Sequence, residues 1–298
     1  MTLEIMIDVF SGRPNPVLKL SGSEARKALE RLHPARHLEK GERGLPPEPT
    51  LGYRGLVIEQ TGKPARGLPR VFRLVDGDLF GPRLAHRAAD DNFEDFICDS
   101  TGLLREAKLG KEFPSLLRKE IERFREVRLK WPWRPCRWPK KHPCRCAPLY
   151  EPAWWNDGAQ KQLHNNCYNY ASNYRTDTFR LLPDGSQPGA ASGAMYTSLT
   201  CGSVTPAAVA DGLIDSPASN NKCPAEGHLV ALVIWPGQDF HWYRKGRNGY
   251  WTHKPGQTAA TNVDNSGVSI SDPRTANRGS YTDFCTFMVV MHGHIKIK

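Results

Sequence analysis

The feature that most constrains folding is a basic, proline-rich segment near the middle of the chain. Between Arg128 and Arg145 there are seven Lys or Arg residues, three tryptophans, four prolines and no acidic residue. Proline lacks a backbone N–H and clashes with the preceding helical turn, so this spacing excludes a regular helix. We therefore expect a linker over residues 128–149, between an N-terminal domain over residues 1–127 and a C-terminal domain over residues 150–298.

The linker also carries part of the net charge of +10 that the 298 residues have. Basic side chains interleaved with tryptophans suit an anionic polymer with stackable groups, or a charged interface. In the alternative interpretation, the tryptophans pack on the flanking domains and the linker has only a structural role. If the segment does bind a polyanion, the binding residues are Arg134, Arg137, Lys140 and Lys141.

The N-terminal domain has an α+β pattern and no chemical motif. Apolar and polar residues alternate over the first strand, and the later helix has an apolar stripe at helical spacing. The expected elements are a strand over 3–10, a helix over about 21–32, strands at 56–58 and 71–75, and a helix over about 114–128.

The C-terminal domain is expected to be α+β as well, with a helix near residue 167 followed by an antiparallel meander. Tight-turn signals at Pro236-Gly237 and Asn248-Gly249 separate the first three strands of that meander. The expected strands cover 228–235, 239–245, 249–254, 267–271 and 283–291. A two-residue turn after Trp235 places His228 and His241 on the same sheet face, roughly 13 Å apart.

The eight cysteines give no clear disulfide pattern. The first residues lack a basic region followed by an apolar core, so we expect no Sec signal peptide, a cytoplasmic location or non-Sec export, and reduced thiols. Disulfide-stabilised secretion remains an alternative. Cys136, Cys144 and Cys146 with His142 have poor spacing for zinc. No apolar run is long enough to span a bilayer.

Cys167 is the strongest candidate for chemistry. Asn165 or Asn166 can cap a helix there, which places the thiol in the first turn, where free N–H groups lower a thiol pKa. The side chains of Gln162 or Asn166 can contribute to an oxyanion hole. The alternative is a buried structural cysteine, although the polar neighbours of Cys167 argue against a plain core position.

Two histidines compete to be the base. His228 begins an apolar strand, whereas His241 lies within the next strand and shares its face with polar residues. A third group has to orient the imidazole, and Asn262 and Asp272 both follow in the sequence. His253 is a weaker candidate, because a two-residue turn puts it on the opposite side.

Two segments resemble the cysteine and histidine motifs of the papain-like superfamily: Cys167–Ala171 and Gly227–Val233. They are closest to the CHAP and NlpC/P60 branches, and Ile270–Pro273 resembles the strand-end Asp-Pro of the C39-type branch. The resemblance covers about 165–275. It implies a cysteine nucleophile, a histidine base and a polar orienting residue, with no metal or other cofactor.

We therefore expect a cysteine-dependent hydrolase, a peptidase or amidase acting through an acyl-enzyme on a peptide, protein or peptidoglycan-type substrate. A bacterial toxin or effector role would suit the basic linker. His241 is favoured over His228 because acids and amides lie downstream of it and polar residues share its face, whereas position 245, expected opposite His228, is a lysine. The rival hypothesis is a non-catalytic polyanion- or envelope-binding protein.

Overall fold

The computed structural model describes residues 2–32, 50–65, 67–76, 78–81, 84–87, 93–99, 104, 109–130 and 144–298. Two compact units divide the chain. The first consists of Met1–Val9, Asn15–Glu48 and Tyr53–Leu129, and the second of Phe10–Pro14, Pro49–Gly52 and Lys130–Lys298. Most of the expected linker, residues 131–143, lies outside the described residues.

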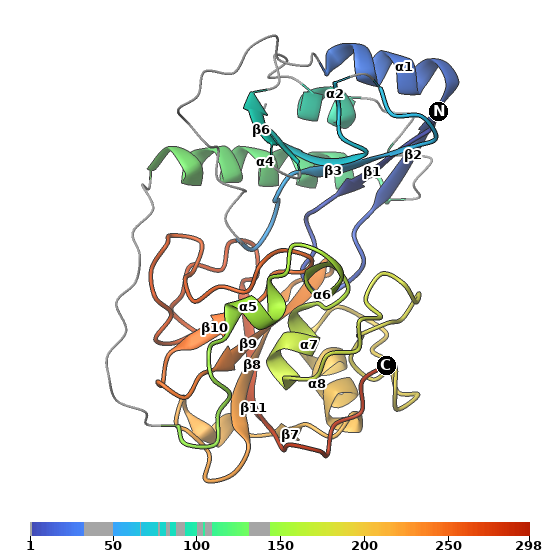
Figure 1. The fold of residues 1–298 in the computed structure, drawn as a ribbon. Coiled ribbons are helices and arrows are strands. Elements are labelled where there is room, and N and C mark those ends of the chain that lie inside the picture. Colours follow the sequence, from blue (N-terminus) through green and yellow to red (C-terminus); the bar gives the residue numbers. More distant parts are fainter. Residues whose placement is uncertain are drawn as a thin grey trace. The chain divides into compact units, whose positions relative to one another are not determined.

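The first unit is built on a six-stranded antiparallel sheet in the order β2-β1-β3-β4-β5-β6 (Figure 1). Helix α1 packs on β1 and β2 through its small buried residues Ala25 and Ala28. The strands are β1 (Thr2–Ile7), β2 (Val17–Ser21), β3 (Leu56–Thr61), β4 (Val71–Val75), β5 (Asp78–Gly81) and β6 (Leu84–Arg87). The helices are α1 (Gly22–Arg31), α2 (Phe93–Asp99) and α4 (Phe113–Lys130).

The second unit is built on a five-stranded antiparallel sheet in the order β10-β9-β8-β11-β7. Strand β8 is central and buried along its whole length, as its unbroken apolar run requires. The strands are β7 (Ile214–Asp215), β8 (His228–Trp235), β9 (Asp239–Lys245), β10 (Trp251–His253) and β11 (Asp283–Val290). The helices are α5 (Pro152–Trp155), α6 (Gln160–Leu163), α7 (Cys167–Ser172), α8 (Cys201–Ala210) and the 3-10 turn η1 (Pro217–Ser219).

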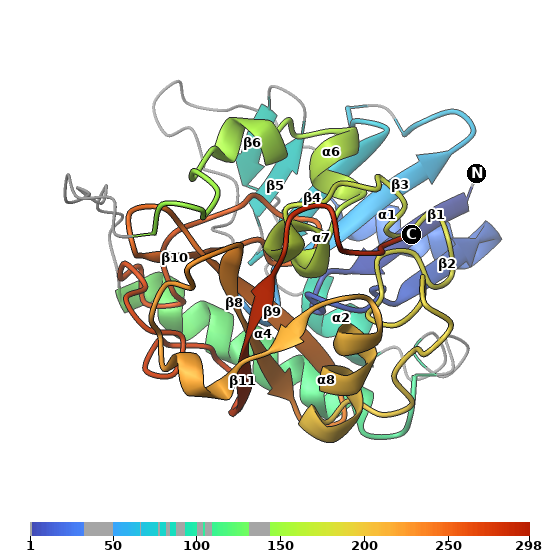
Figure 2. The ribbon, with the colours of Figure 1, turned by 90° about the horizontal axis from the view of Figure 1, so that it is seen from below.

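Two helices pack on this sheet and enclose its core. Helix α7 contacts β9 and β10, and α8 contacts β8 and β11 (Figures 1 and 2). The α+β fold class is thereby confirmed. Helix α8 lies within residues 183–227, a Gly/Ser/Pro-rich stretch for which the sequence predicts no helix. Residues 267–271 form isolated bridges instead of the expected strand. None of the described helices combines the length and apolarity needed to cross a bilayer.

The β8–β9 hairpin differs from its expected register by one residue. Trp235 pairs with Asp239, so three residues form the turn, and Val233 lies opposite His241. Because side chains alternate between sheet faces, one extra turn residue moves every side chain of β9 to the other face. The expectation that His228 and His241 share a face is therefore wrong.

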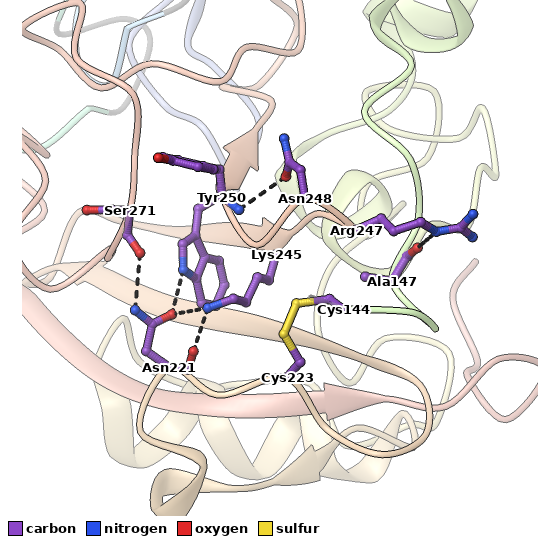
Figure 3. The surroundings of a disulfide bond; sticks show 10 residues. Cys144, Ala147, Asn221, Cys223, Lys245, Arg247, Asn248, Tyr250 and Ser271 are labelled. Atoms are coloured by element: carbon purple, nitrogen blue, oxygen red, sulfur yellow. Dashed lines mark hydrogen bonds between the residues drawn. A yellow bond between two sulfur atoms is a disulfide. The ribbon is translucent and has the colours of Figure 1, made fainter. Parts of the chain in front are cut away.

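Two disulfides correct the expectation of reduced thiols. Cys144 pairs with Cys223, and Cys201 with Cys285. Beside the first bond, the Asn221 side chain donates to the Ser271 carbonyl and accepts from Lys245 of β9 (Figure 3). Partial burial lowers the pKa of Lys245 to about 8. The free thiols of the described residues are those of Cys98, Cys146 and Cys167.

The bond between Cys201 and Cys285 links α8 to β11 across 84 residues of sequence. We expect the double variant Cys201→Ala/Cys285→Ala to lose about 2–4 kcal/mol of unfolding free energy, because closing a long loop restricts the unfolded chain. Urea unfolding without reductant measures this loss. The variant Cys146→Ser, which changes an exposed free thiol, is the control and should unfold as the wild type does. An unchanged midpoint in the double variant would contradict the prediction.

Candidate functional site

Helix α7 presents Cys167 as its first residue. Asn166 caps the helix: its side-chain oxygen accepts from the N–H groups of Tyr168 and Asn169, at 2.9 and 3.2 Å. The Asn169 side chain accepts from the Asn166 N–H in return, which completes a capping box. The expectation of an N-cap immediately before the thiol is confirmed.

A buried lysine fixes the chain that leads into α7. The Lys254 ammonium donates to the carbonyls of Gln162, Asn165 and Gly256, at 2.7, 2.6 and 2.6 Å. Its side chain is fully buried, so these charge-assisted bonds replace its hydration. Burial raises the pKa of the Cys167 thiol, and the positive charge of Lys254 offsets a small part of that rise.

The thiol itself is fully buried and is not activated in this arrangement. Burial, with a smaller effect of the Asp239 carboxylate, raises the pKa of Cys167 to about 12. Hydrogen bonds to the Trp242 backbone and to the Ser11 hydroxyl lower it, but by less. The first turn of α7 therefore does not give the low thiol pKa that we expected from the sequence.

His241 lies at the centre of a buried relay of hydrogen bonds. Its Nδ1 pairs with the Ser11 hydroxyl, and its Nε2 lies 2.9 Å from Nδ1 of His253. Nε2 of His253 in turn lies 2.9 Å from the Val263 carbonyl oxygen. Tyr243 stands edge-on to the His241 ring at 4.8 Å and restricts its rotation.

The end of the relay determines where the protons lie. The Val263 carbonyl can only accept, so Nε2 of His253 carries the proton and its Nδ1 is an acceptor. With both rings neutral, His241 then donates from Nε2, and its Nδ1 has a free lone pair that accepts from Ser11. His241 is thus held in the tautomer whose Nδ1 can take a proton.

Ser11 connects the thiol with this imidazole. Its hydroxyl hydrogen-bonds Nδ1 of His241, and hydrogen bonding by the same side chain lowers the pKa of the Cys167 thiol. Cys167 belongs to the core cluster with Phe240 and Trp242, whereas His241 occupies the alternate position of β9. The thiol lies 4.0 Å from the Phe240 carbonyl oxygen, alongside the β9 backbone. Among the described residues, no direct hydrogen bond joins the thiol to a histidine.

A second set of contacts holds the segment around Ser11. The Asp239 carboxylate accepts from the backbone N–H groups of Ser11, Gly12 and Arg13, the last at 2.9 Å. The Tyr281 hydroxyl donates to the same carboxylate at 2.5 Å. Burial raises the pKa of Asp239, and these four donors partly offset that rise.

Two side-chain amides converge on the Gly12 carbonyl oxygen. Nδ2 of Asn166 donates to it at 2.8 Å and Nε2 of Gln187 at 3.0 Å. Both amides are held in orientation, because the oxygen of Asn166 caps α7 and the oxygen of Gln187 accepts from Tyr196. Asn166 therefore lies where the sequence suggested a carbonyl-binding residue, whereas Gln162 donates instead to the Gln257 carbonyl.

His228 is not part of this group. Its Nε2 lies 2.7 Å from the Ala171 carbonyl, near the end of α7, and burial lowers its pKa to about 3. It is a neutral histidine that joins β8 to the helix.

The two orienting residues expected from the sequence have other partners. Asp272 forms an ion pair with Arg274 at 2.6 Å and accepts from Asn221. The backbone carbonyl of Asn262 accepts from Ile270. The group beside His241 is His253, which pairs with Tyr243 in the sheet and so shares the face of His241. The two-residue turn assumed from the sequence had put it on the opposite face.

Ser11 and Gln187 gave no sequence signal, because their partners lie far away in the chain. The proposed polyanion-binding residues Arg134, Arg137, Lys140 and Lys141 lie outside the described residues.

Comparison with known proteins finds one informative similarity. The chain is 46% identical over 148 residues to insoluble matrix shell protein 1 of Ruditapes philippinarum, a match that covers 49% of this chain and 91% of the relative. No protein-family model matches the chain. No solved structure matches it either.

The buried neutral state of His228 predicts a specific loss of stability in acid. The pKa is about 3 in the folded chain and about 6.5 when unfolded, so below pH 6.5 only the unfolded chain takes up this proton. Stability from this residue is complete above pH 6.5 and falls as the pH drops towards 3. Between pH 6.5 and 4.5 we expect the wild type to lose about 2 kcal/mol more than His228→Gln, which keeps the donor to Ala171. Urea unfolding at several pH values measures this, and parallel pH profiles would contradict it.

Proposed function

The chain belongs to the same family as insoluble matrix shell protein 1, and within that family we propose that it is a cysteine-dependent hydrolase, a peptidase or amidase working through an acyl-enzyme. The observation that carries the proposal is the Ser11 hydroxyl, which contacts both the Cys167 thiol and the accepting Nδ1 of His241. One hydroxyl separates a nucleophile from a correctly protonated base. The papain-like resemblance of the segment Cys167–Ala171 supports a nucleophile role for Cys167. The histidine of the other resembling segment, His228, lies outside the site, so the role of His241 rests on its contacts alone.

The proposed reaction follows from the positions of these groups. Once Ser11 has left, Nδ1 of His241 takes the thiol proton, and the Cys167 sulfur attacks the carbonyl carbon of an amide or ester. Nδ1 then returns the proton to the leaving group as the tetrahedral intermediate collapses to a thioester. Water, deprotonated by the same nitrogen, hydrolyses the thioester and restores the thiol.

The other residues have supporting roles in this scheme. His253 accepts a hydrogen bond from the Nε2–H group of His241. As a positioning residue, it thereby holds the ring in place and stabilises the imidazolium that forms. The amides of Asn166 and Gln187 donate to one carbonyl oxygen and can polarise it. Because burial is the main cause of the high pKa of Cys167, we expect this pKa to fall when the Ser11 segment leaves and water reaches the thiol.

The roles of Cys167 and His241 can be tested with p-nitrophenyl acetate, which acylates nucleophiles without needing a specific binding site. We expect an acetyl thioester on Cys167 and more nitrophenolate release than from Cys167→Ala, which cannot form this thioester. His241→Gln should slow acylation about 10²-fold. His253→Gln should cause a smaller loss and shift the pH profile, because the His241 tautomer is no longer fixed. Mass spectrometry locates the acetyl group.

The control for this experiment is Cys146→Ser, which removes an exposed free thiol and should leave the acetylation of Cys167, followed by mass spectrometry, unchanged. Equal rates in the wild type and Cys167→Ala would overturn the hydrolase proposal.

The relative favours a second candidate function. Its printed name describes a matrix protein, and the two disulfides of this chain would suit an oxidising location outside the cell. On this alternative, the chain is a non-catalytic matrix component that binds an anionic polymer through its basic segment, and the relay is structural.

Heparin affinity at increasing salt tests the alternative. Counterion release by four basic contacts predicts binding that weakens on the order of 10²-fold between 50 and 200 mM salt. The variant with Arg134, Arg137, Lys140 and Lys141 replaced by Ala should bind weakly and with a flatter salt dependence, while Cys167→Ala should bind as the wild type does. Salt-independent binding would contradict this function.

A further inference from the structure

Residues Phe10–Pro14 are held by the second unit in the way that a bound peptide is held. Three consecutive N–H groups converge on the Asp239 carboxylate, and the Gly12 carbonyl faces two amide donors. Main-chain groups supply these contacts, so a separate peptide of the same shape could make them too. The Arg13 guanidinium lies 4.1 Å from the centroid of the Phe10 ring, which closes the segment into a bend.

Glycine is required at position 12 by the space available. A Cβ placed on Gly12 would lie 2.5 Å from the backbone carbonyl oxygen of Phe240 and would overlap the Phe240 ring as well. The backbone oxygen belongs to β9 and cannot move aside without breaking the hairpin. Gly12 does not have a positive φ, so its conformation does not require glycine. Glycine is required because the ring and backbone oxygen of Phe240 leave no room for a side chain.

We propose that this site binds peptides with a Ser-Gly bend, and that Phe10–Pro14 occupies it in cis as a plug over Cys167 and His241. The proposal names the substrate class of the hydrolase and rests on that function for its catalytic meaning, although peptide binding can be measured without turnover. Ser11 fills the position between thiol and imidazole, and Gly12 fits against Phe240. The Asp239 carboxylate accepts hydrogen bonds from the consecutive N–H groups.

The test uses the full chain and the accessibility of Cys167. In Gly12→Ala, the added methyl cannot fit against Phe240, so the segment should leave the site. Alkylation of Cys167 by iodoacetamide at pH 8, mapped by mass spectrometry, should then be at least about tenfold faster than in the wild type, because water and reagent reach the thiol. The matched control is Gly202→Ala in α8, where a Cβ meets open space, and it should be labelled at the wild-type rate.

Peptides added in trans to Gly12→Ala separate release of the plug from loss of the fold. The peptide acetyl-Phe-Ser-Gly-Arg-Pro-amide should protect Cys167 again, whereas the matched peptide with Ala in place of Gly should not. An unfolded site could not show this preference. The proposal is overturned if Gly12→Ala is labelled at the wild-type rate, or if both peptides or neither peptide protects the thiol.

Failure of the proposed function gives a different result. If Gly12→Ala is protected only by the glycine peptide but forms no Cys167 thioester with p-nitrophenyl acetate, the peptide site stands and the hydrolase proposal falls. Faster acylation in Gly12→Ala than in the wild type, together with selective protection, supports both.

Discussion

The contacts around Cys167 depend on one buried carboxylate. Asp239 begins β9 and accepts from three consecutive N–H groups and from Tyr281. An ionised carboxylate is stable at such a depth only when hydrogen bonds replace its water. Asp239 therefore needs the Ser11–Arg13 segment as much as the segment needs Asp239. Once that contact forms, Ser11 lies against His241, and the Gly12 carbonyl lies between its two amide donors.

Local signals in the sequence predicted the helix start that carries Cys167. Asn166 caps the helix that begins at the next residue, Cys167, so the start of α7 could be inferred from adjacent positions. The two long strands of the hairpin were also predicted within their observed limits. The histidine partners were not, because side chains in a strand alternate and a single additional turn residue reverses the face. That one residue separated His228 from His241. The connection from β9 to β10 also differs from the expected two-residue turn, and its register brings His253 beside His241.

The remaining parts of the site have no local signature. Ser11 and His241 are 230 residues apart, and Gly12 and Gln187 are 175 apart. In the sequence, Ser11 and Gly12 only mark a turn. The need for glycine at position 12 becomes visible only when the Phe240 carbonyl is in place beside it. The disulfide partners are equally distant, so their pairing depends on the finished sheet.

A purely structural role explains the relay less well than a chemical one. Stability alone would be served as well by apolar side chains, since a buried polar network offers little net gain over good packing. Here the chain of donors ends on a carbonyl that can only accept, which leaves Nδ1 of His241 unprotonated at the other end. An unprotonated Nδ1 is the state that a base requires. It faces the Ser11 hydroxyl, which also acts on Cys167, the buried free thiol among the described residues of this unit. Burial in the core raises the pKa of that thiol, whereas the Ser11 hydroxyl lowers it by a smaller amount. Under the mechanism proposed above, the Ser11 segment therefore has to leave the site before Cys167 can act as a nucleophile.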